Sequence, residues 1–354
     1  MSRTARMLEG LIRIDTRNPG GDERGLSLQL ARLLVPFRPD RLDVVPVLGG
    51  HSYVLASFGL PKTLVNAHID TVPTAAGWTR PPHEPYERDG RIFGLGAADT
   101  KGAIAAALTA LELARPRDLG LLFSGDEEHG GSCMRAFLAS DAAQWVKRAL
   151  VCEPTGLRVG TRHRGLMTFR AEAQGEGGHS SLADALDKPV VTLCRVAVAL
   201  DDWSRLKLLA GPPGFKGMCV NVAELRGGVA FNVVPPMAEL IWSLRPPPGA
   251  NIEEVKTELA QLMPPNVLWR ATLENPPFET KDVAGFQRLL GSRVDSPIDL
   301  GFWTEAALLS AAGIDAVVWG PGDVASAHAA NESVAIAELD EARMMLGDLY
   351  RGSV

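Results

Sequence analysis

The sequence predicts an α/β protein in which a mostly parallel-sheet domain is interrupted by an inserted α+β domain. Before residue 162 and again after residue 276, short apolar runs typical of buried strands alternate with helical segments. This order is expected of a parallel sheet covered on both faces. Between them the order is strand, helix, strand, strand, helix, strand, a β-α-β-β-α-β arrangement. We therefore expect one discontinuous domain (1–161 and 277–354) and one inserted domain (162–276).

The elements of the first domain follow from apolar periodicity. The amphipathic N-terminal segment is expected to form the first helix. Further helices are expected at residues 26–37, 100–115 and 133–140, and the helix at 100–115 follows a glycine-rich turn. Short apolar runs predict strands at residues 51–59, 63–70, 119–125 and 148–154. Ligands of such sheets gather at the carboxyl ends of the strands.

In the inserted domain, and in the part of the first domain that follows it, the spacing of apolar residues again distinguishes strands from helices. Strands are expected at residues 166–175, 218–225, 237–245 and 267–274, with helices at 185–200 and 252–262. Helices then follow at 284–292, 304–314 and 335–350, around a strand that begins at Asp315. The chain crosses between the two domains twice, which makes hinge motion plausible.

Composition narrows the class of protein. The 354 residues favour about two domains, and 46% hydrophobic and 22% charged residues are ordinary for a globular chain. A net charge of −6 argues against nucleic-acid binding through a broad basic surface. Four scattered cysteines, the absence of a signal-peptide pattern and the absence of an 18-residue apolar run predict a cytoplasmic protein with reduced thiols and no membrane partner.

Three adjacent carboxylates, Asp126, Glu127 and Glu128, follow a buried-looking strand. Adjacent like charges repel each other, so a cation is expected nearby. Four other strand-end or loop segments carry side chains that can bind metals, and with the acidic triplet they provide these candidates: His68 and Asp70, Asp99, Glu128, Glu153, and His328. His68 and Asp70 point to one face of their strand because alternate residues do so.

Each candidate alone has an ordinary structural explanation. A strand-end histidine is more often held by hydrogen bonds, Asp99 could cap the following helix, and Glu153 could be a solvated loop residue. Together they place two histidines and several carboxylates at the carboxyl edge of one sheet, and such nitrogen and oxygen ligands suit zinc. Two ions bridged by Asp99 would use one histidine and one carboxylate each, from His68, His328, Glu128 and Glu153, and would leave Glu127 and Asp70 for chemistry.

The ordered motifs HID (68–70), GLGAADTKG (94–102), GDEE (125–128), CEPT (152–155), GGHSS (177–181) and GPGDVASAH (320–328) resemble the di-zinc metallopeptidase and deacylase family. That family includes acetylornithine deacetylase, succinyl-diaminopimelate desuccinylase, aminoacylase and glutamate carboxypeptidase. The resemblance covers nearly the whole chain. It implies a catalytic metal-binding domain, an inserted lid and dimerisation domain, and two divalent ions, with zinc expected and cobalt as an alternative.

Carried over residue by residue, the resemblance implies the same five ligands. Glu127 corresponds to the general base that takes a proton from metal-activated water, and Asp70 to the residue that orients His68. His179 corresponds to a histidine that stabilises the oxyanion and, in dimeric members, reaches the partner's active site. A homodimer is therefore expected. The roles of Asp126 and His129 stay open, although Asp126 is expected to organise its turn.

Smaller details indicate a branch of the family. Leu95, RHRGLMTF (162–169) and FWTEAALL (302–309) resemble the acetylornithine deacetylase group, and residues 299–328 resemble the N-acetylcitrulline deacetylases. The implied function is removal of the acetyl group from an N-acetyl amino acid in arginine biosynthesis. Alternatives on the same scaffold are a desuccinylase, an acetyl-lysine deacetylase or a dipeptidase. A catalytically silent binding protein is disfavoured because no expected catalytic residue is replaced.

Three residues are candidates for substrate recognition. Arg245 could hold the substrate carboxylate as a bidentate clamp, or could be a surface residue at a strand end. Asn232 could face the same site, or could serve a turn. Glu305 could meet a side-chain amine or ureido group, or could simply favour the dipole of the helix that follows it.

Overall fold

The computed structural model of the chain describes residues 2–352. Two compact units can be distinguished by their internal contacts, and each is described separately. Unit 1 comprises Met1–Thr161, Thr280–Ile298 and Thr304–Val354, and unit 2 comprises Arg162–Glu279 and Asp299–Trp303. The expected α/β class with a mostly parallel central sheet and a separate antiparallel sheet is confirmed.

The centre of unit 1 is a run of four parallel strands in the order β6-β3-β7-β17. Their bounds are Leu119–Ser124, Thr63–His68, Arg148–Val151 and Asp315–Val318. The residues of these strands are almost all buried, as expected for strands covered on both faces.

Antiparallel strands flank this centre. On one side β6 pairs with β2 (Ser52–Phe58), which pairs with β1 (Arg41–Pro46). On the other side β17 pairs with β8 (Gly160–His163), which also pairs with β16 (Ile298–Leu300) and β15 (Phe278–Glu279). Strand β1 was not among the strands predicted from the sequence.

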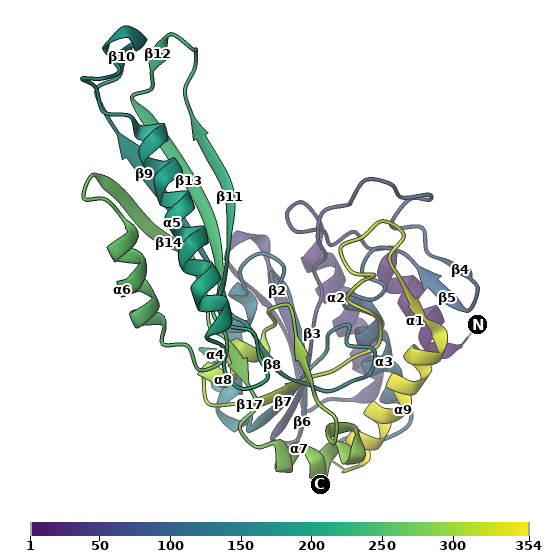
Figure 1. Cartoon of the computed structure of the whole chain (residues 1–354). Coiled ribbons are helices and arrows are strands. Elements are labelled where there is room, and N and C mark those ends of the chain that lie inside the picture. Colours follow the sequence, from purple (N-terminus) through teal and green to yellow (C-terminus); the bar gives the residue numbers. More distant parts are fainter. Residues whose placement is uncertain (1, 353–354) are drawn as a thin grey trace. The chain divides into compact units, whose positions relative to one another are not determined.

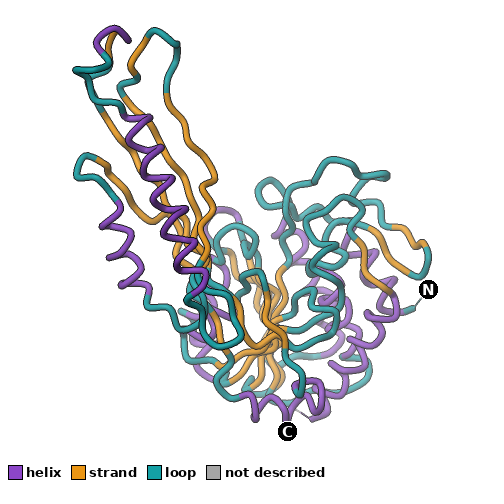
Figure 2. The backbone as a smooth tube through the Cα atoms, in the orientation of Figure 1, coloured by secondary structure: helices purple, strands orange, loops and turns teal. Residues whose placement is uncertain are grey.

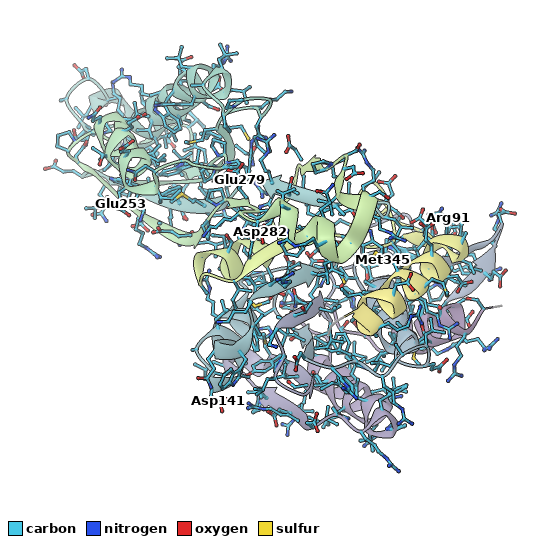
Figure 3. The ribbon with its side chains drawn as sticks, turned by 90° about the horizontal axis from the view of Figure 1, so that it is seen from below. Arg91, Asp141, Glu253, Glu279, Asp282 and Met345 are labelled. Atoms are coloured by element: carbon cyan, nitrogen blue, oxygen red, sulfur yellow. The ribbon has the colours of Figure 1, made fainter. Side chains whose placement is uncertain are left out.

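Helices cover both faces of the sheet of unit 1, as Figure 1 shows. The helices of one face are α1, α2, α3 and α9, with bounds Arg3–Ile12, Glu23–Leu34, Lys101–Ala110 and Ile336–Gly352. Their apolar residues form one core with Leu121 and Phe123 of β6, and Met345 of α9, labelled in Figure 3, belongs to it. The opposite face carries α4 (Ser132–Leu138) and α8 (Ala306–Ala311).

Shorter elements complete unit 1. Helix α7 (Val283–Leu290) contributes Phe286 and Leu290 to the main core. A three-stranded sheet has the order β18-β5-β4, with bounds Ser333–Ala335, Arg91–Phe93 and Tyr86–Arg88. This small sheet ties the segment before α9 to the segment before α3, and both segments carry residues of the candidate site.

Unit 2 contains the predicted β-α-β-β-α-β order. Figure 2 colours its strands orange and its helices purple. Its antiparallel sheet has the order β11-β13-β9-β14, with bounds Cys219–Gly227, Met237–Arg245, Leu166–Gln174 and Val267–Asn275. Alternate residues of β9 and β13 pack with α5 (Pro189–Leu209) and α6 (Ile252–Leu262) in a separate core. A two-stranded pair, β10 (Gly178–His179) with β12 (Val233–Val234), lies beyond the start of β13.

Candidate metal centre

The candidate ligands of unit 1 lie at the carboxyl ends of its parallel strands. His68 is the last residue of β3, and the acidic triplet begins two residues after β6 ends. Glu153 follows β7 by two residues. These strands pair in register: His68 lies opposite Ser124, and Asn66 lies opposite both Leu122 and Val151. The strand ends that carry the candidate ligands therefore meet at one edge of the sheet.

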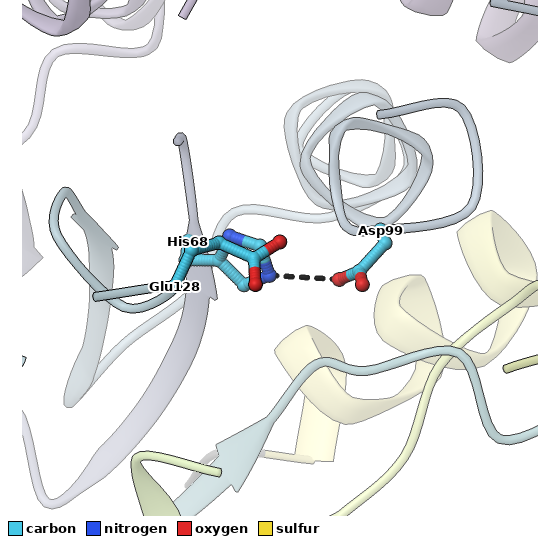
Figure 4. Close-up of side chains that lie close together, drawn as sticks. All are labelled: His68, Asp99 and Glu128. Carbon is cyan, nitrogen blue, oxygen red and sulfur yellow. Dashed lines mark hydrogen bonds and ion pairs between the residues drawn. The ribbon is translucent and has the colours of Figure 1, made fainter. Parts of the chain in front are cut away.

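Asp99 lies between the two histidines. Its Oδ1 is 2.8 Å from His68 Nε2, and its Oδ2 is 3.2 Å from His328 Nε2. Figure 4 shows the first contact beside Glu128. Thr100, not Asp99, is the N-cap of α3, so helix capping does not explain this aspartate. One carboxylate thus faces two imidazoles with its two oxygens, as a bridging ligand would.

Glu128 joins the same cluster. Its Oε1 is 3.1 Å from His328 Nε2, and ligand atoms of His68, Asp99 and Glu128 all lie within 4.8 Å of one another. Hydrogen bonds to Asp99 and Glu128 raise the pKa of His328 to about 10. The histidine nitrogens and carboxylate oxygens that contact one another here are the atoms that would bind a shared cation.

Glu127 and Glu153 bring further negative charge to the cluster. Burial, followed by the charge of Glu153, raises the pKa of Glu127 well above its usual value. Burial also raises the pKa of Glu153, and the negative charges of Asp99 and Glu128 add to this effect. Buried carboxylates this close to one another need a compensating charge.

Asp70 and Asp126 shape the turn that carries Glu127 and Glu128. Asp70 accepts the backbone N–H of Glu127 on Oδ1 and that of Glu128 on Oδ2, each at 3.1 Å. Asp126 has φ +60° and accepts the backbone N–H of Ser132 at 3.1 Å. The expected turn-organising role of Asp126 is therefore visible in its contacts, whereas His129 is exposed.

The contact between His68 and Asp70 differs in detail from a carboxylate–imidazole pair. His68 Nδ1 lies 2.9 Å from the backbone carbonyl oxygen of Asp70 and 3.5 Å from its Oδ1. The nearer carbonyl oxygen accepts the ring N–H, which leaves Nε2 free to bind a metal. Asp70 therefore orients His68 mainly through its backbone, while its carboxylate holds the acidic turn.

Glu305 lies in unit 1 with 1% of its surface exposed. Its Oε2 accepts hydrogen bonds from Ser124 Oγ at 2.6 Å and from Asn66 Nδ2 at 3.1 Å, whereas Oε1 is buried without a hydrogen-bond partner. Burial raises its pKa to about 7. It is the N-cap residue of α8 but makes no side-chain capping bond. Its carboxylate instead accepts hydrogen bonds from side chains of β3 and β6.

The other three candidates belong to unit 2. His179 is exposed on β10, with Nδ1 2.8 Å from Ser181 Oγ, and the carbonyl oxygen of Asn232 accepts the N–H of Ser180 nearby. Arg245 is the half-buried last residue of β13. Burial lowers its pKa, and the positive charge of Arg164 lowers it further. Within one chain, Asn232 therefore lies beside His179 and far along the sheet from Arg245.

Two polar residues that the sequence did not single out also belong to this edge. Asn18 Nδ2 donates to Asp70 Oδ2 at 3.0 Å and to Asp126 Oδ1 at 3.1 Å. Its Asn-Pro-Gly sequence (18–20) was the available signal, because it is typical of a turn. Glu332 accepts three backbone N–H groups of residues 96–99 and follows His328 by four residues.

The donor set fits divalent ions. It offers two imidazole nitrogens and several carboxylate oxygens, the ligand types that zinc and related ions prefer. The crowding of Glu127, Glu128 and Glu153, whose pKa values are all raised by burial, gives such ions an electrostatic reason to bind. Asp99 faces both histidines, so it could be shared by two ions.

The fold and this edge of the sheet define the class of protein. The chain belongs to the Peptidase family M20/M25/M40, whose model matches residues 64–351. The resemblance to the metallopeptidase and deacylase family is thus confirmed. Among the residues that the structure describes, no helix is both long and apolar enough to span a bilayer.

Particular relatives lie within this family. N-acetyl-L-citrulline deacetylase of Xanthomonas campestris is 34% identical, with 100% of this chain and 99% of the relative covered. Acetylornithine deacetylase of Myxococcus xanthus is 30% identical, with 89% of this chain and 85% of the relative covered. Both are relatives by sequence over most of their length.

Solved structures share the fold at lower identity. The M20 family metallo-carboxypeptidase Sso-CP2 of Sulfolobus solfataricus matches with a TM-score of 0.78 and 16% identity, covering 99% of both chains. A dinuclear metal-binding M20 peptidase of Bacillus subtilis, YXEP, matches with a TM-score of 0.72 and 13% identity, covering 99% of this chain and 97% of that one.

Proposed function

We propose that this protein is a metal-dependent amidohydrolase that removes the acetyl group from an N-acetyl amino acid, with acetylcitrulline or acetylornithine as substrate. The observation that carries the proposal is the position of Asp99 between His68 and His328, with Glu128 in the same cluster and Glu127 beside it. The full-length similarity to N-acetyl-L-citrulline deacetylase supports the substrate class. A place in arginine biosynthesis and in the cytosol belongs to the same proposal.

The proposed metal ligands are His68, Asp99, Glu128, Glu153 and His328, for two divalent ions of zinc or cobalt. Such ions supply Lewis-acid polarisation of an amide carbonyl and make water more acidic. The ligands hold those ions at the edge of the sheet, and Asp70 and Asn18 hold the turn that brings Glu127 and Glu128 there.

Glu127 is the proposed general base. It accepts a proton from the attacking water as the new C–O bond forms at the acetyl carbon. It then returns that proton to the amine nitrogen as the C–N bond breaks, so that acetate and a free amino acid leave. His179 is proposed to donate a hydrogen bond to the developing oxyanion.

Substrate recognition is assigned to Arg245, Asn232 and Glu305. Arg245 would bind the α-carboxylate, because its half-buried guanidinium lies at the end of β13 near the like charge of Arg164, where an anion would be favoured. Glu305 Oε1 is buried and unbonded, so it could accept a hydrogen bond from a side-chain amine or ureido group. Asn232 accompanies His179.

A homodimer is part of the proposal, and the geometry of unit 2 supports it. The nine-residue strand β13 separates Arg245 from the end that carries His179 and Asn232 by roughly 27 Å, at about 3.4 Å per residue. An N-acetyl amino acid cannot span that distance. One chain's Arg245 and a second chain's His179 would therefore complete one site.

The exposed side of unit 2 offers a surface for the second chain. Strand β11 is an edge of its sheet, and α5 and the following segments expose apolar side chains. Examples are Val198 at 61%, Leu209 at 86% and Phe231 at 100% exposed. A second chain could pair with the open edge of β11 and cover exposed apolar side chains such as these.

A substrate panel tests the function. Purified protein is stripped with a chelator, reloaded with zinc or cobalt, and given acetylcitrulline, acetylornithine, acetyl-lysine, succinyl-diaminopimelate and a dipeptide. Release of acetate from one of the first two, well above the others, is expected. Preferred cleavage of the succinyl compound, acetyl-lysine or the dipeptide would replace the proposed substrate class.

A further inference from the structure

A buried glutamate outside the proposed ligand set connects the two loops that carry Asp99 and His328. Glu332 has 2% of its surface exposed and lies between His328 and strand β18. It contacts the loop before α3, which ends in Asp99. The contacted residues of that loop precede Glu332 by 233 to 236 positions in the sequence. Its carboxylate is directed entirely at the backbone of that loop.

The contacts use both carboxylate oxygens. Oε2 accepts the N–H of Gly96 at 2.8 Å, and Oε1 accepts the N–H groups of Ala98 at 2.8 Å and Asp99 at 3.0 Å. The backbone carbonyl oxygen of Glu332 also accepts the N–H of Gly94 at 3.0 Å. Four hydrogen bonds from one residue therefore fix the backbone from residue 94 to residue 99. With its oxygens occupied, Glu332 is not a candidate ligand.

The neighbours of Glu332 fix its own position. Asn331 Oδ1 accepts the N–H of Thr79 at 3.0 Å and its Oγ1 hydroxyl at 2.8 Å. Ser333 begins β18, and its Oγ accepts Arg91 Nε of β5 at 3.0 Å, a residue labelled in Figure 3. The segment is therefore anchored on both sides of Glu332, so the glutamate is a fixed point against which the Asp99 loop is set.

A carboxylate at this place has an electrostatic cost. It is buried, and it adds a negative charge near that of Asp99. A neutral side chain could fill the same volume without that repulsion. The three N–H donors offset part of this cost by stabilising the charged form, and the arrangement gives Asp99 a fixed backbone position.

We propose that Glu332 is a positioning residue that sets Asp99 against His328, so that one oxygen of Asp99 faces each of the two histidines. This inference rests on the proposed metal centre. Hydrogen-bonded residues behind metal ligands commonly change metal affinity or activity by about 10- to 100-fold when they are replaced.

The test is Glu332→Gln, compared with Glu338→Gln as a matched control. The amide keeps the size of the side chain but directs a donor group toward N–H donors, so at least one of the three bonds is lost. Glu338 lies six residues later and accepts one backbone N–H, that of Gly322 at 2.7 Å, and among the described residues it makes no hydrogen bond to residues 94–99. Zinc affinity is measured by competition with a chelator, and the cobalt-loaded proteins are compared by their visible absorption.

About 10- to 100-fold weaker zinc binding and an altered cobalt spectrum are expected for Glu332→Gln, with near wild-type values for Glu338→Gln. A folded Glu332→Gln protein with wild-type zinc affinity and an unchanged cobalt spectrum would overturn the inference. If the wild-type protein binds no zinc, the proposed metal centre itself fails. If the wild type binds zinc and the two variants do so equally, only the role of Glu332 fails.

Hydrogen exchange of the metal-free wild type keeps the inference testable if Glu332→Gln does not fold. The amide protons of Gly96, Ala98 and Asp99 are expected to exchange slowly before any metal is added, because Glu332 holds them. Exchange at the rate of an open loop would contradict this.

Glu332→Asp provides a second variant, since a side chain shorter by one methylene cannot reach all three N–H groups, and it should weaken zinc binding as well.

Discussion

The proposed site residues of the two units have opposite surroundings. In unit 1, His68, Asp99 and Asp70 are buried and contact one another or the same turn. In unit 2, His179 is exposed, and Arg245 is half-buried at the far end of the sheet. Unit 1 therefore contains the proposed metal ligands already gathered in one cluster, whereas the proposed groups of unit 2 lie apart and would need a substrate or a second chain to act together.

This difference predicts different consequences for mutation. A change in unit 1 should affect metal binding or the chemical step, because the groups there already form one cluster. A change in unit 2 should affect substrate binding or stability and leave the metals in place.

Glu127→Gln should give the largest loss. The variant keeps the shape of the side chain but cannot accept the proton from water, so turnover is expected to fall by roughly 100- to 10,000-fold with metal content unchanged. Turnover and bound metal are measured on the same samples. His129→Ala, a change at an exposed position in the same turn, is the control and should stay near wild type. Near-normal turnover in metal-loaded Glu127→Gln would remove the general base.

Asp70→Asn tests how the acidic turn is held. Asparagine retains one acceptor oxygen where Asp70 uses two, for Glu127 N–H and Glu128 N–H. We expect a loss of about 10- to 100-fold in metal affinity or turnover. Metal titration by calorimetry together with steady-state kinetics would show it. Unchanged values for both would mean that Asp70 acts only through its backbone carbonyl oxygen on His68.

Arg245→Met tests the contribution of unit 2 to substrate binding. Loss of a charged hydrogen bond to the α-carboxylate, worth about 1.5–3 kcal/mol, should raise KM by roughly 10- to 150-fold while the metal content is unchanged. Arg270→Met, at an exposed position of β14, is the matched control. If both variants keep the wild-type KM, the carboxylate clamp lies elsewhere.

His163 gives the smallest effect, a dependence of stability on pH. Burial, with a further contribution from the charge of Arg245, lowers its pKa from 6.5 to about 4. The unfolded chain takes up a proton first as the pH falls, so this contribution to stability is complete above about pH 6.5 and is lost as the pH falls toward 4. About 2 kcal/mol should be lost between pH 7.5 and pH 5.

His163→Phe supplies the comparison for this pH dependence. The variant has no proton to take up at residue 163, so its loss of stability over the same interval should be smaller by about the same amount. Urea unfolding at the two pH values measures it. Equal losses in the variant and in the wild type would show that other groups cause the pH dependence.

Much of unit 1 was predictable because its signals are local. Buried parallel strands are continuous apolar runs, and the proposed ligand residues lie at their carboxyl ends or shortly after them, as His68 and Glu128 do. Strand β1 (Arg41–Pro46) escaped prediction because it is a partly exposed edge strand without a continuous apolar run. The β-α-β-β-α-β order of unit 2 was equally readable from its alternating strands.

What the sequence could not supply were contacts between distant segments. The hydrogen bonds of Asn18 to Asp70 and Asp126 join residues 52 and 108 positions apart. Glu332 contacts a loop more than 230 positions away. Neither residue has a local pattern that reveals its partner. The motifs identify ligand types, and the packing of loops decides which backbone groups hold them.

We propose that unit 1 holds two divalent ions on which hydrolysis of an N-acetyl amino acid depends. The most direct test is to count zinc ions per chain and to measure acetate released from acetylcitrulline and acetylornithine in the same samples. These samples are taken before chelation, after chelation and after reloading. We expect two ions per chain, loss of turnover on chelation and its return on reloading. Full turnover in metal-free protein, or no zinc bound by the folded chain, would contradict the account.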